Sequence, residues 1–328
     1  MADDVGPDVD PQEVLHARGV TDGLPVVPPT AERVRAAVAA SGRPGDALIG
    51  LVAPRLGRAT VERIAVNAVM AGCRPDYMPA VIAAVEAICD PDFSLVGVSG
   101  TTDAVAPLLI VNGPARAALG VNSGAGAFGP GWRANATIGR AMRLCWLNIG
   151  GAAPGVISMS TFSQPGRYTY CIGENEEASP WEPLHVERGF GAAESTVGAM
   201  VAETLQVVAD TQHRRAREVL TTIARSGSVI ASEAHGGLTD TLLVVSPEHA
   251  RTIGEDGWSK SDVREFLWRE TRALVNGAPV PKFREPSNLH IVVVGGPAGR
   301  FSAWIPGWPF AGSPARLVLK PIRYSTPR

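Results

Sequence analysis

One stretch of the sequence gathers most of the side chains that could do acid–base chemistry. Residues 171–190 read CIGENEEASPWEPLHVERGF and contain five glutamates, one cysteine and one histidine. Only 19% of the whole chain is charged, so this concentration of carboxylates is unusual for the protein. A carboxylate beside another carboxylate in a partly dry site is harder to ionise and can act as a general acid. The stretch therefore predicts an active-site loop, with a solvated surface loop as the alternative.

Two mechanisms fit the residue types in this stretch. In the first, Cys171 is a nucleophile or redox thiol at the tip of a strand, and His185 is its base. In the second, Glu177, His185 and Glu187 bind a divalent metal ion. The residue types do not decide between them. The candidate catalytic residues are Cys171, Glu174, Glu176, Glu177, His185 and Glu187.

A glycine-rich segment precedes a predicted helix and could bind an anion. Residues 120–132 read GVNSGAGAFGPGW, and dense glycine lets backbone N–H groups approach an anion near a helix N-terminus. Arg133 follows this segment and could bind a carboxylate with its guanidinium group. The spacing matches neither the P-loop nor GxGxxG, which disfavours nucleotide binding. A tight crossover loop that binds nothing is an equally weighted alternative.

Three polar residues next to a predicted strand could hydrogen-bond a carbonyl or carboxylate group. Asn112 lies at the end of that strand, and Thr101 and Thr102 lie in a polar turn before it. Turn or capping hydrogen bonds are the alternative for all three. The candidate substrate-binding residues are Asn112, Asn122, Ser123, Gly124, Gly126, Arg133, Thr101 and Thr102.

Three apolar runs predict buried strands. They read LLIVNGPA at 108–115, LLVVSPEH at 242–249 and IVVVGGPA at 291–298, and each passes directly into a turn signal. The β-branched residues in 195–201 favour a further strand over a helix. Helical periodicity separates these runs, which places the chain in the α/β class, with mixed sheets and flanking helices. The predicted helices cover residues 31–40, 60–71, 79–89, 135–147 and 259–274.

The first two apolar runs are followed by the same succession of elements. Each continues into a short helical turn that ends in glycine, then a loop with glycine and tryptophan, then a longer amphipathic helix. Repetition at this spacing predicts two related lobes from an internal duplication. We expect an N-terminal arm over residues 1–30, a first α/β lobe over 31–190 and a second over 191–328.

The composition excludes several classes of protein. A formal net charge of −2 provides no basic surface for nucleic acid. No apolar run is long enough to cross a membrane, and the acidic N-terminus is unlike a signal peptide, so we expect a cytoplasmic protein. None of the four cysteines forms a CxxC pair, which disfavours a zinc knuckle or thioredoxin motif. The low fraction of charged residues predicts a covered surface, and hence a homo- or hetero-oligomer.

Five segments together resemble a widespread bacterial family of about this chain length that is functionally uncharacterised. They are DGLPVVPPT, NAVMAGCRPDYMP, NSGAGAFGPGWRANATIGRAMRL, CIGENEEASPWEPLHVERGF and EDGWSKSDVREFL, and the resemblance covers nearly the whole chain. Genes of that family often neighbour a small thioredoxin-like protein with a Cys- or selenocysteine-Gly-Ser-Cys motif. The resemblance therefore implies a thiol-redox partner protein, and it identifies no catalytic residues.

We expect from these patterns an enzyme that acts on a small polar or anionic metabolite. It would use acid–base and thiol chemistry at the Cys-Glu-His loop, with cleavage of a carbon–heteroatom bond as the favoured reaction. One alternative is a metal-dependent hydrolase or lyase that uses glutamate and histidine ligands. Another is a non-catalytic subunit of a larger enzyme complex. The sequence identifies no cofactor.

Overall fold

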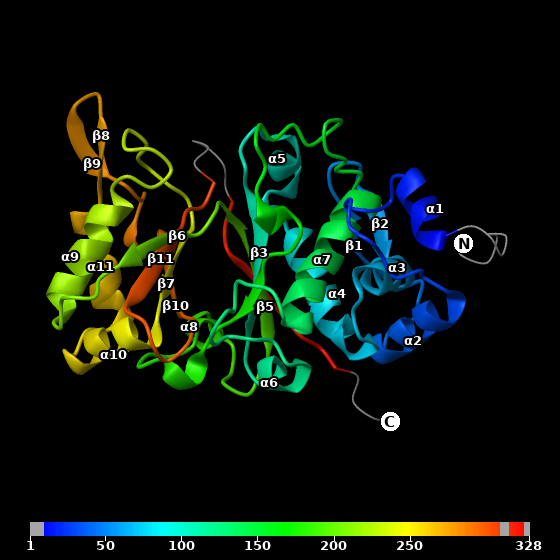
Figure 1. Cartoon of the computed structure of the whole chain (residues 1–328), viewed down its shortest axis with the longest axis horizontal. Coiled ribbons are helices and arrows are strands. Elements are labelled where there is room, and N and C mark those ends of the chain that lie inside the picture. The colour runs from blue at the N-terminus through cyan, green and yellow to red at the C-terminus, as the bar shows by residue number, and fades with distance from the viewer. Residues whose placement is uncertain (1–9, 309–314, 325–328) are drawn as a thin grey trace.

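The structure, a computed structural model, describes residues 10–308 and 315–324. Two four-stranded sheets pack against each other, and helices cover the outer face of each sheet, which gives four layers (Figure 1). This architecture confirms the predicted α/β class with mixed sheets and flanking helices. Among the described residues, no helix has the length and apolar character needed to cross a membrane.

The first sheet is built around one parallel pair of strands. Its strand order is β12 (Val318–Pro321), β5 (Thr196–Ala202), β3 (Ala106–Asn112) and β4 (Cys171–Gly173). β3 is parallel to β4 and antiparallel to β5, and β12 is antiparallel to β5. Every residue of β3 and β5 is buried, which explains their nearly continuous apolar sequences.

The second sheet has the same pattern of strand directions. Its strand order is β10 (Leu289–Val293), β7 (Thr241–Val245), β11 (Phe301–Ile305) and β6 (Gln206–Ala209). β7 is parallel to β10 and antiparallel to β11, and β6 is antiparallel to β11. All three apolar runs are therefore confirmed as strands, and so is the strand expected at 195–201. The duplication itself stays a prediction.

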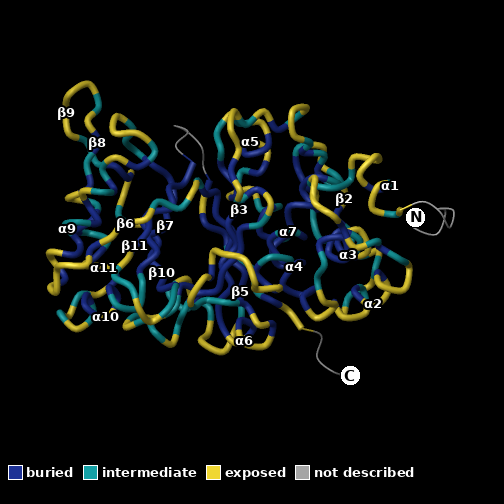
Figure 2. Tube along the Cα trace, in the orientation of Figure 1, coloured by how far each residue is buried: buried dark blue, intermediate teal, exposed yellow. Residues whose placement is uncertain are grey.

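Side chains along each central strand alternate between two cores. Leu108 and Ile110 of β3 share a core between the sheets with Leu242 and Val244 of β7. Leu109 points the other way, into a core that the first sheet forms with its helices. Figure 2 shows the resulting band of buried residues through the middle of the molecule.

Two groups of helices cover the outer faces of the sheets. The first sheet packs against α3 (Val61–Ala71), α4 (Met78–Ile88) and α7 (Arg133–Asn148). The second packs against α9 (Ala216–Gly227), α10 (Pro247–Glu255) and α11 (Lys260–Glu270). α4 is almost wholly apolar in sequence because it is buried on nearly every side. The predicted helix over 259–274 is shorter in the structure, since it ends at Glu270.

Shorter elements complete the chain. Two hairpins are separate from the main sheets: β1 (Leu48–Val52) with β2 (Gly57–Thr60), and β8 (Arg272–Val275) with β9 (Ala278–Pro281). The remaining α-helices are α1 (Pro11–Ala17), α2 (Ala31–Ser41), α5 (Leu95–Gly100), α6 (Ala115–Leu119) and α8 (Leu184–Glu187). Short 3-10 helices occupy Pro75–Tyr77, Pro91–Phe93, Pro165–Arg167, Glu176–Ala178 and Pro286–Asn288.

The predicted division of the chain does not follow the sheets. β5 and β12 both come after residue 190, yet they pair within the first sheet. The predicted boundary at residue 190 is therefore not a boundary between the sheets. In the predicted N-terminal arm, residues 10–30 lie on the first helical layer, where Val27 N donates to Met70 O at 3.1 Å. Residues 1–9 lie outside the described residues.

Candidate functional site

The predicted glutamate loop starts at the carboxyl end of β4, where the two sheets meet. Glu174 N donates a hydrogen bond to Val111 O of β3 (3.2 Å), and Asn175 N donates to Val293 O of β10 (2.7 Å). The carboxyl ends of β3, β4 and β10 therefore lie together. Ligands of open α/β sheets usually bind at such strand ends. We call Asn112, Glu174 and His185, which are buried, and Glu176, which is partly buried, the junction cluster.

Glu174 is the most deeply buried carboxylate of the junction cluster. Its side chain is 0% exposed, and Oε2 accepts hydrogen bonds from Asn112 Nδ2 (2.6 Å) and Leu184 N (2.8 Å). Lys260 Nζ lies 4.0 Å from Oε1. Burial raises the pKa of Glu174 to about 7, although Lys260 and the two hydrogen bonds favour the charged form. This carboxyl group can therefore gain or lose a proton near neutral pH.

Glu176 ties the loop to the end of β3. Its Oε1 accepts hydrogen bonds from Gly113 N (2.7 Å) and Asn112 Nδ2 (3.1 Å), and it lies 3.0 Å from Arg116 Nε. Arg116 also binds both carboxylate oxygens of Glu177, at 3.1 and 2.7 Å. The hydrogen bonds from Arg116 lower the pKa of Glu177, whose side chain is largely exposed. Glu177 is therefore an ion-paired surface residue.

His185 is fully buried, and its hydrogen-bonding capacity is unused. Neither ring nitrogen has a hydrogen-bond partner among the described residues. Nδ1 lies 4.0 Å from Glu176 Oε1, which is too far for a hydrogen bond. Asn112 Oδ1 and Glu174 Oε1 are also buried without partners in the described part of the chain. Buried polar atoms rarely lack hydrogen-bond partners, so these atoms could bind a polar ligand.

Glu187 connects α8 to α11, one of the helices that cover the second sheet. Its carboxylate is 3.1 Å from Lys260 Nζ and also binds Arg264, both on α11. Burial would raise the pKa of Glu187, but these two cations outweigh it and hold the pKa below the usual range. His185 and Glu187 both lie in the one-turn helix α8, where residues two apart do not face the same side.

The predicted metal site is not formed. Glu177 is committed to Arg116, whereas Glu187 is committed to Lys260 and Arg264. Within the described ranges, no group of three or more His, Cys, Asp or Glu side chains has the arrangement of a metal site. The structure therefore does not bring Glu177, His185 and Glu187 together as a set of metal ligands.

The structure also contradicts the predicted thiol role of Cys171. This side chain is 5% exposed and belongs to the core between the first sheet and its helices. Burial raises the pKa of its thiol to about 12. A nucleophilic cysteine needs the opposite environment, with an accessible and stabilised thiolate. Cys171 was expected at the tip of a strand, whereas it is the first residue of β4, and its side chain points into the core on the helix side.

The start of the glycine-rich loop lies against the glutamate loop. Asn122 O accepts a hydrogen bond from Gly173 N (3.1 Å), and Ser123 O accepts one from Gly295 N (2.9 Å). Other contacts are internal: Gly124 N donates to the side chain of Asn122 at 2.9 Å. Gly126 adopts a left-handed φ of 71°, which favours glycine in this tight turn. These contacts support the crossover-loop interpretation.

Three predicted binding residues lie away from the junction cluster. Arg133 Nε and Nη2 donate hydrogen bonds to Gly72 O (3.1 and 2.9 Å). The guanidinium group therefore helps to terminate α3. Thr101 and Thr102 precede the opposite end of β3. Thr101 Oγ1 accepts from Asp103 N at 3.1 Å, and Thr102 O accepts from Thr161 N at 2.8 Å. The structure therefore supports a role for Thr101 and Thr102 in turn hydrogen bonds.

Two cations of the site were missed from the sequence. Arg116 and Lys260 are distant in sequence from the glutamates that they bind. A signal was present for Arg116, which lies in the first helical turn after a predicted strand, whereas Lys260 begins the second helix after β7. Comparisons with protein-family models, curated proteins and solved structures gave no match. The functional argument therefore depends on the site alone.

Proposed function

We propose that the protein is an enzyme that acts on a small polar or anionic metabolite by acid–base chemistry at the junction cluster. The observation that carries this proposal is a set of buried polar atoms on Asn112, Glu174 and His185. These atoms have no hydrogen-bond partner among the described residues. These atoms lie where the carboxyl ends of parallel strands meet. A structural ion-pair network would have no need for such unsatisfied atoms.

The side chains suit the cleavage of a carbon–heteroatom bond. Glu174, protonated, would donate its proton to the leaving heteroatom, and His185 would accept a proton from the neighbouring carbon. Asn112 Oδ1 would orient the substrate. Because Asn112, Glu174 and His185 are fully buried, substrate entry would require α8 to move, and Glu187 holds this helix through its contacts with α11.

Turnover in a metabolite mixture tests this function even though the substrate is unidentified. Purified protein is incubated with a cell extract, and mass spectrometry follows the species that disappear. Wild-type protein and the matched variant Glu182→Gln should convert the same species, since Glu182 is exposed in the same loop. Glu174→Gln should slow the conversion by ~100-fold or more, because it removes the proton donor. Equal turnover by Glu174→Gln, or no conversion by wild type, would contradict the proposal.

A non-catalytic subunit is the second candidate, because three other glutamates of the loop are held in ion pairs. Glu176, Glu177 and Glu187 each contact Arg or Lys side chains that fix the loop in place. If the loop has only this role, Glu174→Gln will change stability and leave every metabolite unchanged. The turnover experiment therefore separates the two candidates.

We also propose a cytoplasmic location in a bacterium, a homo- or hetero-oligomer and a thioredoxin-like partner. The low fraction of charged residues and the family resemblance support these proposals. The partner would not exchange disulfides with Cys171, because that thiol is buried. Co-purification from the native cell is the measurement for the partner.

A further inference from the structure

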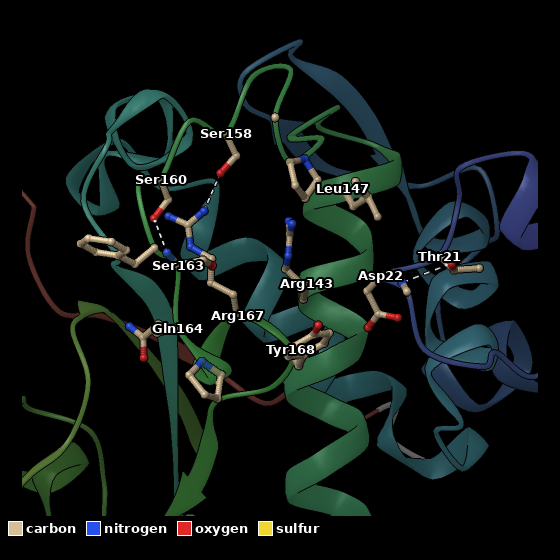
Figure 3. A pocket seen from close by; sticks show the side chains of 15 residues that line it. Thr21, Asp22, Arg143, Leu147, Ser158, Ser160, Ser163, Gln164, Arg167 and Tyr168 are labelled. Carbon is tan, nitrogen blue, oxygen red and sulfur yellow. Dashed lines mark hydrogen bonds between the residues drawn. The ribbon is translucent and has the colours of Figure 1, made fainter.

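A cavity of about 680 Å³ opens at the end of β3 opposite to the junction cluster. Its wall comes from α7, from the loop that leads to β4 and from the segment before α2, as Figure 3 shows. Arg167 on this wall bonds Val105 O, just before β3, whereas Asn112 ends that strand. Seven strand residues separate the two places by roughly 20 Å. The cavity is therefore distinct from the proposed acid–base site.

Arg143 projects from α7 into this cavity, and no carboxylate of the described residues forms an ion pair with it. Its side chain is 5% exposed, and Nη1 has no hydrogen-bond partner in the described part of the chain. The guanidinium group lies over the Trp146 ring, 4.8 Å from the ring centre. Burial and the charge of Arg167 lower the pKa of Arg143 to about 10, so the group still carries its charge at neutral pH.

Arg167 brings a second buried guanidinium group to the same ring. It lies 5.7 Å from the centre of Trp146 and is 8% exposed. Nε donates to Val105 O (2.8 Å), Nη1 to Ser158 Oγ (2.5 Å) and Nη2 to Asp103 O (3.3 Å). Neutral oxygens accept all these hydrogen bonds, so the charge of Arg167 is oriented without being neutralised.

The acidic residue in the cavity wall is already paired with another arginine. Asp22 accepts two hydrogen bonds of 2.8 Å from Arg140, a neighbouring arginine outside the wall. Asp22 still acts on Arg143 through space, and Asp103 acts on Arg167, but among the described residues no carboxylate forms a direct ion pair with either guanidinium group. Buried cations without a directly paired carboxylate are costly, and a bound anion would reduce that cost.

The rest of the wall indicates the kind of anion. Leu147 provides apolar surface and Ser158 a hydroxyl group (Figure 3). Pro154 and Phe162 add further apolar surface to the wall. A volume of about 680 Å³ is typical of sites for small organic molecules and exceeds what an inorganic ion needs. An arginine pair binds carboxylate and phosphate oxygens well, because guanidinium groups donate two parallel hydrogen bonds.

We propose that this cavity is a binding site for a small organic anion. The carboxylate or phosphate oxygens of the ligand lie between Arg143 and Arg167, and its apolar body packs against Leu147, Pro154 and Phe162. This site goes beyond the proposed function, because it is separate from the junction cluster. Arg133 and the glycine-rich loop were the predicted anion-binding site. The site proposed here instead uses Arg143 and Arg167.

Binding of four probes to the full chain tests the charged group and the apolar body separately. The probes are acetate, phenylacetate, inorganic phosphate and phenyl phosphate, titrated by calorimetry at constant ionic strength. Phenylacetate or phenyl phosphate should bind saturably and at least ~10-fold more tightly than its small counterpart, since only the phenyl probes reach the apolar wall. The stronger of the two identifies the ligand as a carboxylate or a phosphate. No saturable binding of either phenyl probe would overturn the proposal.

Variants of Arg143 test its role in binding. Arg143→Met should weaken the tighter phenyl probe at least ~10-fold and should raise the melting temperature of the ligand-free protein, because it removes an unpaired buried charge. Arg251→Met is the matched control, an exposed arginine on α10, and should change neither value. Unchanged probe affinity in Arg143→Met would overturn the proposal. If that variant does not fold, Arg143→Lys is tested instead, because lysine keeps the positive charge but cannot donate two parallel hydrogen bonds. Unchanged probe affinity in Arg143→Lys would also overturn the proposal.

Discussion

Replacing Gly113 by alanine is expected to destabilise the protein by at least ~3 kcal/mol, because it strains the backbone and forces atoms apart. Gly113 follows β3 with a φ of 78°, a conformation that residues with a side chain rarely adopt. An alanine Cβ would lie 2.0 Å from Glu194 O. Relief of this overlap would also move the Gly113 N–H away from Glu176, which it contacts at 2.7 Å. Urea denaturation followed by circular dichroism measures the loss.

Gly120→Ala is the matched control for this substitution. Gly120 has a similar φ of 69°, but nothing lies within 4 Å of the position of its Cβ. Its substitution should therefore cost only the backbone strain, about 1 kcal/mol. If both variants lose the same stability, the close approach of Gly113 to Glu194 is not important for the junction.

The second large effect concerns the dependence of stability on pH. The pKa of Glu174 is about 7 in the folded protein, whereas an unperturbed glutamate, as in the unfolded chain, has a pKa of 4.5. Between these values the folded protein keeps a proton that the unfolded chain releases, so this group makes wild-type stability fall as the pH rises. Glu174→Gln removes that titration. Relative to wild type, the variant should gain about 3 kcal/mol between pH 4.5 and pH 8.

The comparison between the two proteins isolates Glu174 from other groups. Burial also raises the pKa of Glu203 to about 7, but Glu203 is present in both proteins and cancels in the difference. Glu182→Gln, in the same loop but exposed, should follow the wild-type curve. Parallel pH profiles of wild type and Glu174→Gln would mean that Glu174 ionises as an ordinary surface glutamate does.

Local patterns in the sequence predicted the central elements of the fold well. β3, β7 and β10 are buried on both faces, so their apolar runs were visible whichever strands they pair with. Sheet membership was not visible in this way. β12 pairs with β5 across more than a hundred residues of intervening chain, and no local pattern specifies such a pairing.

The site shows the same division between what is local and what is long-range. Asn112, Glu174 and His185 were predicted as site residues, because polar side chains at strand ends are visible in the sequence. The role of Cys171 could not be decided there. Alternate strand residues point to opposite faces, and only the packed structure shows that Cys171 faces the helices, whereas Ile172 faces the other sheet.

Arg143 was missed for a physical reason. It lies in the amphipathic helix α7, where a single arginine is most simply interpreted as a solvated residue. Its significance comes from burial over Trp146 and from its proximity to Arg167, which arrives from a loop. Tertiary packing of separate segments creates this site, so no motif in the sequence could indicate it.

The central claim is that the junction cluster holds a carboxyl group that exchanges its proton near neutral pH. Carbon NMR of protein labelled at the glutamate carboxyl carbons tests this claim most directly, with Glu174 assigned as the resonance absent from Glu174→Gln. We predict a titration midpoint of about 7 for this resonance. A midpoint near 4.5, the value of an unperturbed glutamate, would contradict the account.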